Sequence, residues 1–408
     1  MWTRLLDRMA SRLIRKGQLT ITYPDADCRR YGPGGPEAAL HIRTPRALRA
    51  LCLNPDLALG EGYMDGTIEI GGNAELEALL ALVLLNRRPG AMPAYIRALD
   101  RMRYHARAWV QRNTAASAKA NVAHHYDISD DLYRLMLDAD MQYSCAYFAH
   151  PDMTLDQAQE AKKHHIARKL MLEPGMSVLD IGCGWGGMAL TLARSYGARV
   201  TGVTLSENQL ATAQKRAAGA GLTDRMTFRL IDYRALQGQY DRIVSVGMLE
   251  HVGLPHFAGY FSKIGSLLHP DGIALIHTIG RVSPPMSHSP WIHKYIFPGG
   301  YVPSLSELMP AMESSGLWQT DIEVWRLHYA RTLRAWRDRF DANLDTVRDW
   351  YDDRFIRMWR YYLTACIMAF EQQEQCVYHL QLAHKRDAVP LTRDYLYRSP
   401  IAPRLAAE

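Results

Sequence analysis

The sequence predicts an α/β protein built on a parallel sheet, preceded by a smaller N-terminal domain. Between residues 178 and 279, strand-like and helix-like segments alternate, which is the order required by a parallel sheet with helices on both faces. The strand segments are nearly continuous apolar runs, as expected for strands covered on both sides. With 408 residues, 48% of them apolar, the chain can form one large domain and a smaller one.

The individual elements can be predicted in order along the chain. Short strands at residues 19–23 and 39–42, with turn signals such as GPGGP, indicate a small mixed domain, and residues 74–119 then become helical and basic. The large domain alternates strands and helices at residues 178–181, 187–195, 199–204, 207–218, 226–231, 242–246 and 273–279. Ser304 and Glu307 form a capping-box signal for a helix that ends near Gly316.

Two further segments complete the predicted large domain. Residues 318–327 and 377–384 both alternate like strands, so they could form an antiparallel pair at the sheet edge. Between them, Trp-rich helices are predicted from Leu333 to Phe370, and these either cover a pocket for a ligand or form a packed helical core.

Positive charge is concentrated in the N-terminal part of the chain. Residues 1–115 carry 17 Lys/Arg against 11 Asp/Glu, whereas the remainder is neutral. This asymmetry predicts an anionic partner, either nucleic acid or an acidic lipid surface. The first helix has an apolar stripe (Trp2, Leu5, Leu6, Met9, Leu13) and a face of arginines (Arg4, Arg8, Arg12, Arg15). It either lies at a membrane interface or packs its stripe on its own domain.

Several protein classes are disfavoured by composition. The longest apolar run, residues 78–85, is far shorter than the roughly 18 to 20 residues that cross a bilayer, and no signal peptide is visible. The six cysteines include no C-x-x-C pair, so neither a zinc site nor a disulfide framework is predicted. A reducing cytosol is the expected compartment.

The stretch VLDIGCGWGGMAL, residues 178–190, predicts a strand, a glycine turn and a helix, an arrangement that brings backbone close to a nucleotide. Gly182, Gly184 and Gly187 match G-x-G-x-x-G, but Thr204 stands where a dinucleotide site needs a carboxylate. Asp180 and Asp232 instead favour the cationic cofactor S-adenosylmethionine. A dinucleotide, or a glycine turn without a ligand, remains open at this point, whereas a Walker loop is excluded because no Lys-Ser/Thr follows.

Four stretches narrow the chemistry: HHYDISDDLYRLMLD, MQYSCAYF, SVGMLEHVG and IHTIG. Together they resemble the cyclopropane-fatty-acid synthases and the related mycolic acid cyclopropane synthases, and IFPGGYVPS and YYLTAC extend the match. The resemblance runs from Asn121 to His384, and residues 1–115 resemble more loosely the extra domain of the phospholipid-acting branch. It implies a Rossmann-like class I methyltransferase fold, with a mostly parallel seven-stranded sheet and an antiparallel edge hairpin.

The resemblance also assigns residues position by position. The residues that match cofactor-contacting positions of the family are Tyr143, Ser144, Gly182, Gly184, Thr204, Leu205, Gln209 and Gly247. Asp180 and Asp232 are added to this set from the glycine-turn argument. The matches to positions that hold a bicarbonate ion are Cys145, Glu250, His277, Ile279 and Tyr329, and Tyr126 matches a tyrosine near that glutamate. Bicarbonate would be the base that removes a proton in a dry pocket, with Glu250 fixing and polarising it. Taken singly, each of these residues is more often structural than functional; their joint placement at strand carboxyl ends favours a site.

The implied function is conversion of cis-unsaturated phospholipid acyl chains into cyclopropane chains with S-adenosylmethionine and bicarbonate, without a metal. The expected domains are a basic lipid-associating domain (1–115), a catalytic domain (116–388) and a tail (389–408). The enzyme is expected in the cytoplasm, peripherally on the inner face of the membrane, with unsaturated phospholipid and no nucleic acid as partner; a homodimer is left open. The alternatives are a lipid C-methyltransferase giving methyl- or methylene-branched chains, a small-molecule N-methyltransferase, and a non-enzymatic nucleotide-binding regulator.

Overall fold

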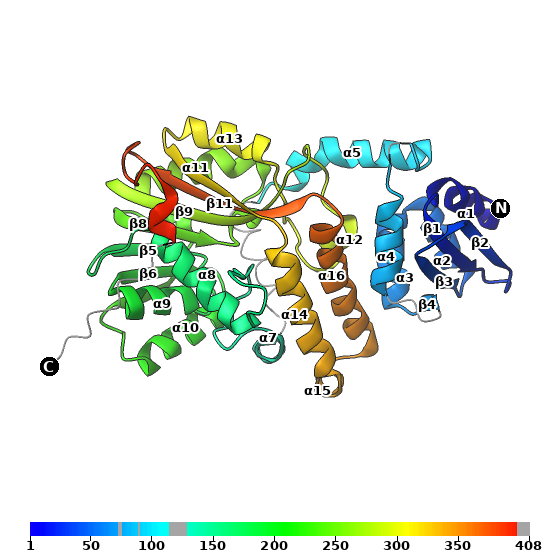
Figure 1. The fold of residues 1–408 in the computed structure, drawn as a ribbon, viewed down its shortest axis with the longest axis horizontal. Coiled ribbons are helices and arrows are strands. Elements are labelled where there is room, and N and C mark those ends of the chain that lie inside the picture. The colour runs from blue at the N-terminus through cyan, green and yellow to red at the C-terminus, as the bar shows by residue number, and fades with distance from the viewer. Residues whose placement is uncertain (72–75, 89, 114–128, 398–408) are drawn as a thin grey trace. The chain divides into compact units, whose positions relative to one another are not determined.

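The computed structural model describes residues 1–71, 76–88, 90–113 and 129–397, and the chain divides into two compact units (Figure 1). Unit 1 comprises Met1–Val110, Met286–Pro298 and Ala330–Gln375. Unit 2 comprises Gln111–Pro285, Gly299–Tyr329 and Cys376–Glu408. Each unit is therefore assembled from segments that are not contiguous in the sequence.

Unit 2 is built on a seven-stranded sheet in the order β10-β11-β9-β8-β5-β6-β7. Its strands are β5 (Ser177–Ile181), β6 (Arg199–Thr204), β7 (Met226–Leu230), β8 (Tyr240–Val246), β9 (Leu268–Arg281), β10 (Trp318–Trp325) and β11 (Gln375–Ala383). The pairs β5–β6, β6–β7, β5–β8 and β8–β9 are parallel, and β10–β11 is antiparallel. The predicted parallel sheet with an antiparallel pair at its edge is confirmed.

Helices cover both faces of this sheet (Figure 1). The helices α8 (Leu155–Lys169), α9 (Gly187–Tyr196) and α10 (Glu207–Gly219) pack on one face, and α11 (Phe257–Leu267) and α13 (Leu305–Ser314) on the other. Side chains alternate between the two faces of each central strand. Val178 and Val244 therefore pack against α8, α9 and α10, while Leu179 and Ile243 pack against α11 and α13. The predicted capping box of α13 is present.

Short elements connect these layers at the ends of the strands. They are α7 (Asp130–Met136), η1 (Tyr233–Ala235), η2 (Leu249–His251), η3 (Leu254–His256) and η4 (Arg393–Leu396). Both η1 and η2 directly follow sheet strands, which places their side chains at the carboxyl edge of the sheet, where ligands bind in open α/β folds.

Unit 1 contains a four-stranded sheet in the order β2-β1-β3-β4. The strands are β1 (Gly17–Thr22), β2 (Cys28–Gly34), β3 (Glu37–Ile42) and β4 (Ile68–Gly71), so both strands predicted in the small domain are confirmed. The helices are α1 (Trp2–Leu13), α2 (Pro45–Leu53), α3 (Pro55–Met64), α4 (Leu76–Leu85), α5 (Ala94–Val110), α12 (Pro290–Tyr295), α14 (His328–Ala342), α15 (Leu344–Trp350) and α16 (Asp353–Glu371).

The packing of unit 1 settles one of two open alternatives. The stripe of α1 lies on the core of its own unit through Leu6 and Ala10, with its arginines exposed, so the own-domain reading is correct. In the Trp-rich helices, Trp336 and Trp359 are fully buried whereas Trp350 is exposed, so packing alone does not decide whether these helices also cover a pocket. Arg334 ties these helices to α4 through ion pairs with Glu77 and Glu371. No described helix is long and apolar enough to cross a membrane.

Candidate active site

The glycine turn between β5 and α9 depends on residues without a side chain. Gly182 has φ +81°, a left-handed conformation that favours glycine, and an added Cβ would lie 3.3 Å from Met248. At Gly187, the first residue of α9, an added Cβ would come within 2.3 Å of Gln142 Nε2 and 2.4 Å of Asp140 Oδ2. The turn therefore brings bare backbone to the edge of the sheet and allows a neighbouring loop to pack directly on the start of the helix.

A cavity opens at this edge, where β5, β6, β7 and β8 end. Seven of the predicted cofactor residues line it, namely Gly182, Gly184, Thr204, Leu205, Gln209, Asp232 and Gly247. The structure thus gathers most of the predicted set into one cavity.

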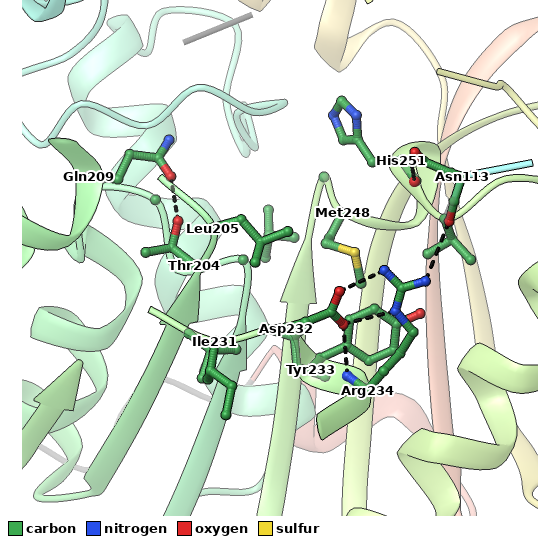
Figure 2. A pocket seen from close by; sticks show the side chains of 17 residues that line it. Asn113, Thr204, Leu205, Gln209, Ile231, Asp232, Tyr233, Arg234, Met248 and His251 are labelled. Carbon is green, nitrogen blue, oxygen red and sulfur yellow. Dashed lines mark hydrogen bonds and ion pairs between the residues drawn. The ribbon is translucent and has the colours of Figure 1, made fainter. Parts of the chain in front are cut away.

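The polar side chains of this cavity are held in fixed orientations (Figure 2). Thr204 Oγ1 donates to Gln209 Oε1 at 2.9 Å, which orients the Gln209 amide. Asp232 accepts from the Nε and Nη2 atoms of Arg234 at 2.9 and 2.6 Å. Burial would raise the pKa of Asp232, but the hydrogen bonds from Arg234 outweigh it and lower the pKa. The carboxylate at the end of β7 is therefore ionised.

The same cavity contains residues that sequence reasoning missed. Arg234 pairs with Asp232, and Asn113 donates to the backbone oxygen of His251. Burial lowers the pKa of His251 to about 4, so its ring is neutral. The adjacency of Asp232 and Arg234 in IDYR was a usable sequence signal, since such neighbours can pair locally, whereas Asn113 is distant in sequence and gave none.

Three predicted cofactor residues, Tyr143, Ser144 and Asp180, do not line this cavity. The ring of Tyr143 packs edge-on against Tyr133, with 5.1 Å between the ring centroids. Burial raises the pKa of Asp180 to about 7, against the opposing charge of Lys162. Its Oδ2 has no hydrogen-bond partner among the described residues. A buried carboxyl without a partner is costly unless a ligand or a proton satisfies it.

Ser144 belongs to a loop that is hydrogen-bonded to side chains of α8. Lys162 Nζ donates to Ser144 Oγ at 2.8 Å and to Gln142 Oε1 at 2.7 Å, and the lysine is fully buried. Gln159 Nε2 donates to the backbone oxygen of Ser144 at 2.9 Å. Burial lowers the pKa of Lys162 to about 8. These two α8 side chains therefore position the loop that carries Ser144 and Cys145, and sequence reasoning did not identify them.

Glu250 and Ile279 lie together although they come from different segments of the chain. Ile279 N–H, near the end of β9, donates to Glu250 Oε1 at 2.6 Å. Glu250 Oε2 is buried and has no hydrogen-bond partner among the described residues. Burial raises the pKa of Glu250 to about 7. A carboxyl in this setting is readily protonated, and its second oxygen is then a donor for an acceptor in the site.

His277, Cys145 and Tyr329 are buried as well. His277 lies two residues before Ile279 on β9, and burial together with the charge of Lys162 keeps its pKa well below the usual value. Cys145 is a fully buried free thiol, and Tyr329 is the second residue of α14. Tyr126 lies outside the described residues. The structure thus links Glu250 to Ile279 and places His277 two residues earlier on the same strand, while the roles assigned to all six residues remain predictions.

Comparison with known proteins gives two sequence-family matches. Residues 113–380 match the family described as mycolic acid cyclopropane synthetase, and residues 5–89 match a domain of unknown function. The cyclopropane-fatty-acyl-phospholipid synthase of Escherichia coli (strain K12) is 39% identical over 367 residues, 90% of each chain. The tuberculostearic acid methyltransferase UfaA1 of Mycobacterium tuberculosis is 34% identical, covering 93% of this chain and 90% of that one.

Solved structures of cyclopropane synthases are similar over about two thirds of this chain. The cyclopropane synthase MmaA2 from Mycobacterium tuberculosis aligns with a TM-score of 0.62 and 34% identity over 65% of this chain and 98% of that chain. The mycolic acid cyclopropane synthase CmaA1, complexed with SAH and CTAB, aligns with a TM-score of 0.62 and 35% identity, over 65% of this chain and 97% of that chain. Coclaurine N-methyltransferase aligns with a TM-score of 0.65 but only 22% identity, which shows the class I methyltransferase fold alone.

Proposed function

This chain belongs to the mycolic acid cyclopropane synthetase family, and we propose that it converts cis-unsaturated acyl chains of phospholipids into cyclopropane chains. The observation that carries this proposal is the likeness to a phospholipid-acting synthase over 90% of each chain. The buried Glu250–Ile279 hydrogen bond supports it, since Ile279 lies two residues after the buried His277 on β9. The chain is an S-adenosylmethionine-dependent methyltransferase.

The residues around the cavity fit S-adenosylmethionine. When bound, this cofactor supplies an electrophilic methyl group. The bare backbone at Gly182 and Gly184 admits a ligand at close range, and the ionised Asp232 at the end of β7 can accept from its amino or hydroxyl groups. Gln209 of α10 accepts a hydrogen bond from Thr204, the last residue of β6, where a dinucleotide site would carry an acid.

The reaction needs a base after methyl transfer. The π electrons of the alkene form the first new C–C bond to the methyl carbon while the bond from that carbon to sulfur breaks. This step would leave a cation on the acyl chain and release S-adenosylhomocysteine. Loss of a proton from the new methyl group then frees the C–H electron pair to close the ring. Such a proton must be taken where water cannot trap the cation, and Glu250 and His277 lie in a buried setting of this kind.

Bicarbonate is the base that we propose, held by Glu250, His277, Ile279, Cys145 and Tyr329, with Tyr126 nearby. The fit rests on Glu250: its Oε2 has no partner among the described residues, and its raised pKa lets it be neutral beside an anion. A permanently ionised glutamate in the same place would repel bicarbonate. In this structure the N–H of Ile279 is already given to Glu250, so Ile279 acts on the ion by orienting that carboxyl.

We further propose that the enzyme works peripherally on the inner face of the membrane, with α5 of the basic N-terminal unit as a contact surface. Tyr95, Met102 and Trp109 are spaced seven residues apart and therefore share one face of α5; the last two are 61% and 71% exposed. Exposed Arg97 and Arg101 lie on the same helix. Large apolar side chains beside arginines suit an acidic phospholipid surface.

A second outcome of the same chemistry stays open because of one relative. UfaA1 is named as a tuberculostearic acid methyltransferase and is similar over 93% of this chain. If the cation is not closed to a ring, the product is a methyl- or methylene-branched chain.

Deuterated cofactor separates part of these outcomes. With a CD₃ donor, ring closure and methylene formation each keep two deuterons in the lipid, whereas a methyl branch keeps three. We expect two deuterons by mass spectrometry of the released fatty acids. Three deuterons would show that the product is a methyl-branched chain and not a cyclopropane.

A further inference from the structure

A buried histidine contacts His277 from the neighbouring strand. His277 Nδ1 lies 2.8 Å from His379 Nε2, with His277 on β9 and His379 on the adjacent strand β11. The two rings are 2% and 0% exposed. The distance requires one nitrogen to carry the proton and the other to accept it. The hydrogen bond therefore determines which tautomer each ring adopts.

Beyond His379 lies Glu323 of β10. His379 Nδ1 is 3.8 Å from Glu323 Oε2 and has no hydrogen-bond partner among the described residues. The same oxygen lies 2.9 Å from His165 Nε2 and 2.8 Å from Lys169 Nζ, and both of these residues belong to α8. Burial would raise the pKa of Glu323, but His165 and Lys169 lower it to about 2. The carboxylate is therefore ionised and presents negative charge to His379.

His165, Glu323 and His379 also lie close enough to hold a metal ion, since their ligand atoms fall within 4.8 Å of one another. The ammonium of Lys169 argues against this, because it already contacts the carboxylate oxygen that a metal would use and it is itself fully buried. Lys169 is further held by Asp321 at 3.0 Å. The place of a cation in this cluster is thus occupied by a side chain of the protein.

The charge of Glu323 selects between the two tautomers. A bare Nδ1 on His379 would direct a lone pair at a carboxylate, whereas a protonated Nδ1 is attracted to it. His379 Nε2 is then the acceptor and His277 Nδ1 the donor. Burial keeps the pKa of both rings well below the usual value, so neither ring carries a second proton.

We propose that Glu323 and His379 are positioning residues that hold His277 with its proton on Nδ1, leaving His277 Nε2 as a hydrogen-bond acceptor. An acceptor at Nε2 favours an anion that carries its own O–H donor. Hydrogen carbonate has such a donor, whereas nitrate and chloride have none. This consequence rests on the proposed function, whereas the tautomer itself is a property of the ligand-free protein.

The tautomer can be read from ¹⁵N spectra of protein labelled in its histidine rings, with His277→Gln to assign the His277 signals. In the wild type we expect a protonated Nδ1 and a bare Nε2. Glu323→Gln removes the charge and His379→Phe removes the acceptor while keeping an apolar contact for Trp325, whose ring lies 4.0 Å away. In both variants the proton of His277 should shift towards Nε2.

Asp321→Asn is the matched control, because Asp321 pairs with Lys169 of the ion cluster and with Arg393 but is not the carboxylate that faces His379. It should leave the His277 tautomer unchanged. Turnover should fall about 10- to 100-fold in Glu323→Gln and His379→Phe, as for residues that orient a catalytic group, with the KM for S-adenosylmethionine within about twofold of the wild type.

Three results would overturn the proposal: a wild-type His277 protonated on Nε2, a tautomer that neither variant changes, or an altered tautomer with unchanged turnover. A wild type that forms no cyclopropane lipid would instead overturn the proposed function, and the tautomer would still be measurable.

Discussion

Glu250 is the residue on which the proposed chemistry depends most. Its Oε1 is satisfied by Ile279, while its buried Oε2 has no partner among the described residues. Glu250→Gln keeps the shape and the Ile279 contact but loses the exchangeable proton. We expect turnover to fall at least about 100-fold, the scale of a lost acid–base group, with S-adenosylmethionine binding unchanged by calorimetry. Unchanged turnover would remove Glu250 from the account.

The raised pKa of Glu250 also predicts a pH dependence of stability. The folded value is about 7 and the unfolded value 4.5, so the folded protein binds the proton more tightly. The stability from this proton is present below pH 4.5 and is lost as the pH rises to about 7.

Glu250→Gln cannot ionise, so it should be more stable than the wild type above pH 7, by at most about 3 kcal/mol. The gap should narrow at pH 5. Urea unfolding at both pH values measures it. A gap that is independent of pH would mean that Glu250 is ionised in the folded protein.

At the scale of elements, the packing of the 140–145 loop on α8 and α9 shapes the site. Gln142 accepts from Lys162, and Asp140 from Lys163, so the loop side chains next to Gly187 have little freedom to move. Gly187→Ala adds a Cβ within 2.4 Å of both of these loop side chains. We expect it to lower the free energy of unfolding by about 1–3 kcal/mol and to weaken S-adenosylmethionine binding.

Gly219→Ala is the matched control, because Gly219 is also helical and an added Cβ there meets nothing within 4 Å. It should be neutral or slightly stabilising, since alanine favours a helix over glycine. Thermal unfolding with and without cofactor compares the two variants. Equal behaviour would show that the loop yields to the Cβ.

The large sheet was predictable from sequence because its strands are apolar runs separated by helices with their own periodicity. The strand at residues 178–181 and the glycine turn after it follow from local rules alone. The buried face of α8 was not predictable. Gln159, Lys162, His165 and Lys169 read as solvated side chains, and only tertiary partners on the 140–145 loop and β10 explain their burial.

For the molecule as a whole, the sequence did not predict which surface exposes large apolar side chains. The N-terminal charge asymmetry indicated an anionic partner, but α1 packs its apolar stripe on its own unit. Among the exposed apolar side chains of the described residues, Tyr95, Met102 and Trp109 are spaced along α5, a segment that reads mainly as basic. The charge asymmetry therefore remains a prediction of an anionic partner, and the exposure of these side chains makes α5 the surface that we propose for it.

Vesicle binding tests this surface. Replacing both Met102 and Trp109 by alanine should weaken co-sedimentation with vesicles containing acidic phospholipid by about tenfold or more, because two large apolar anchors are lost. Trp318→Ala is the control, since Trp318 is also exposed, at 54%, but lies on β10. Binding of the wild type should also decrease with salt. Equal loss in both variants would mean that α5 has no special role.

The proposed product is a cyclopropane ring in a phospholipid acyl chain. The most direct measurement is incubation of the purified chain with S-adenosylmethionine and vesicles of mono-unsaturated phospholipid, followed by mass spectrometry and proton NMR of the fatty acids. We expect a gain of one CH₂ with high-field cyclopropane protons. The same mass gain with vinyl protons would show a methylene branch, and no lipid product at all would contradict the proposed function.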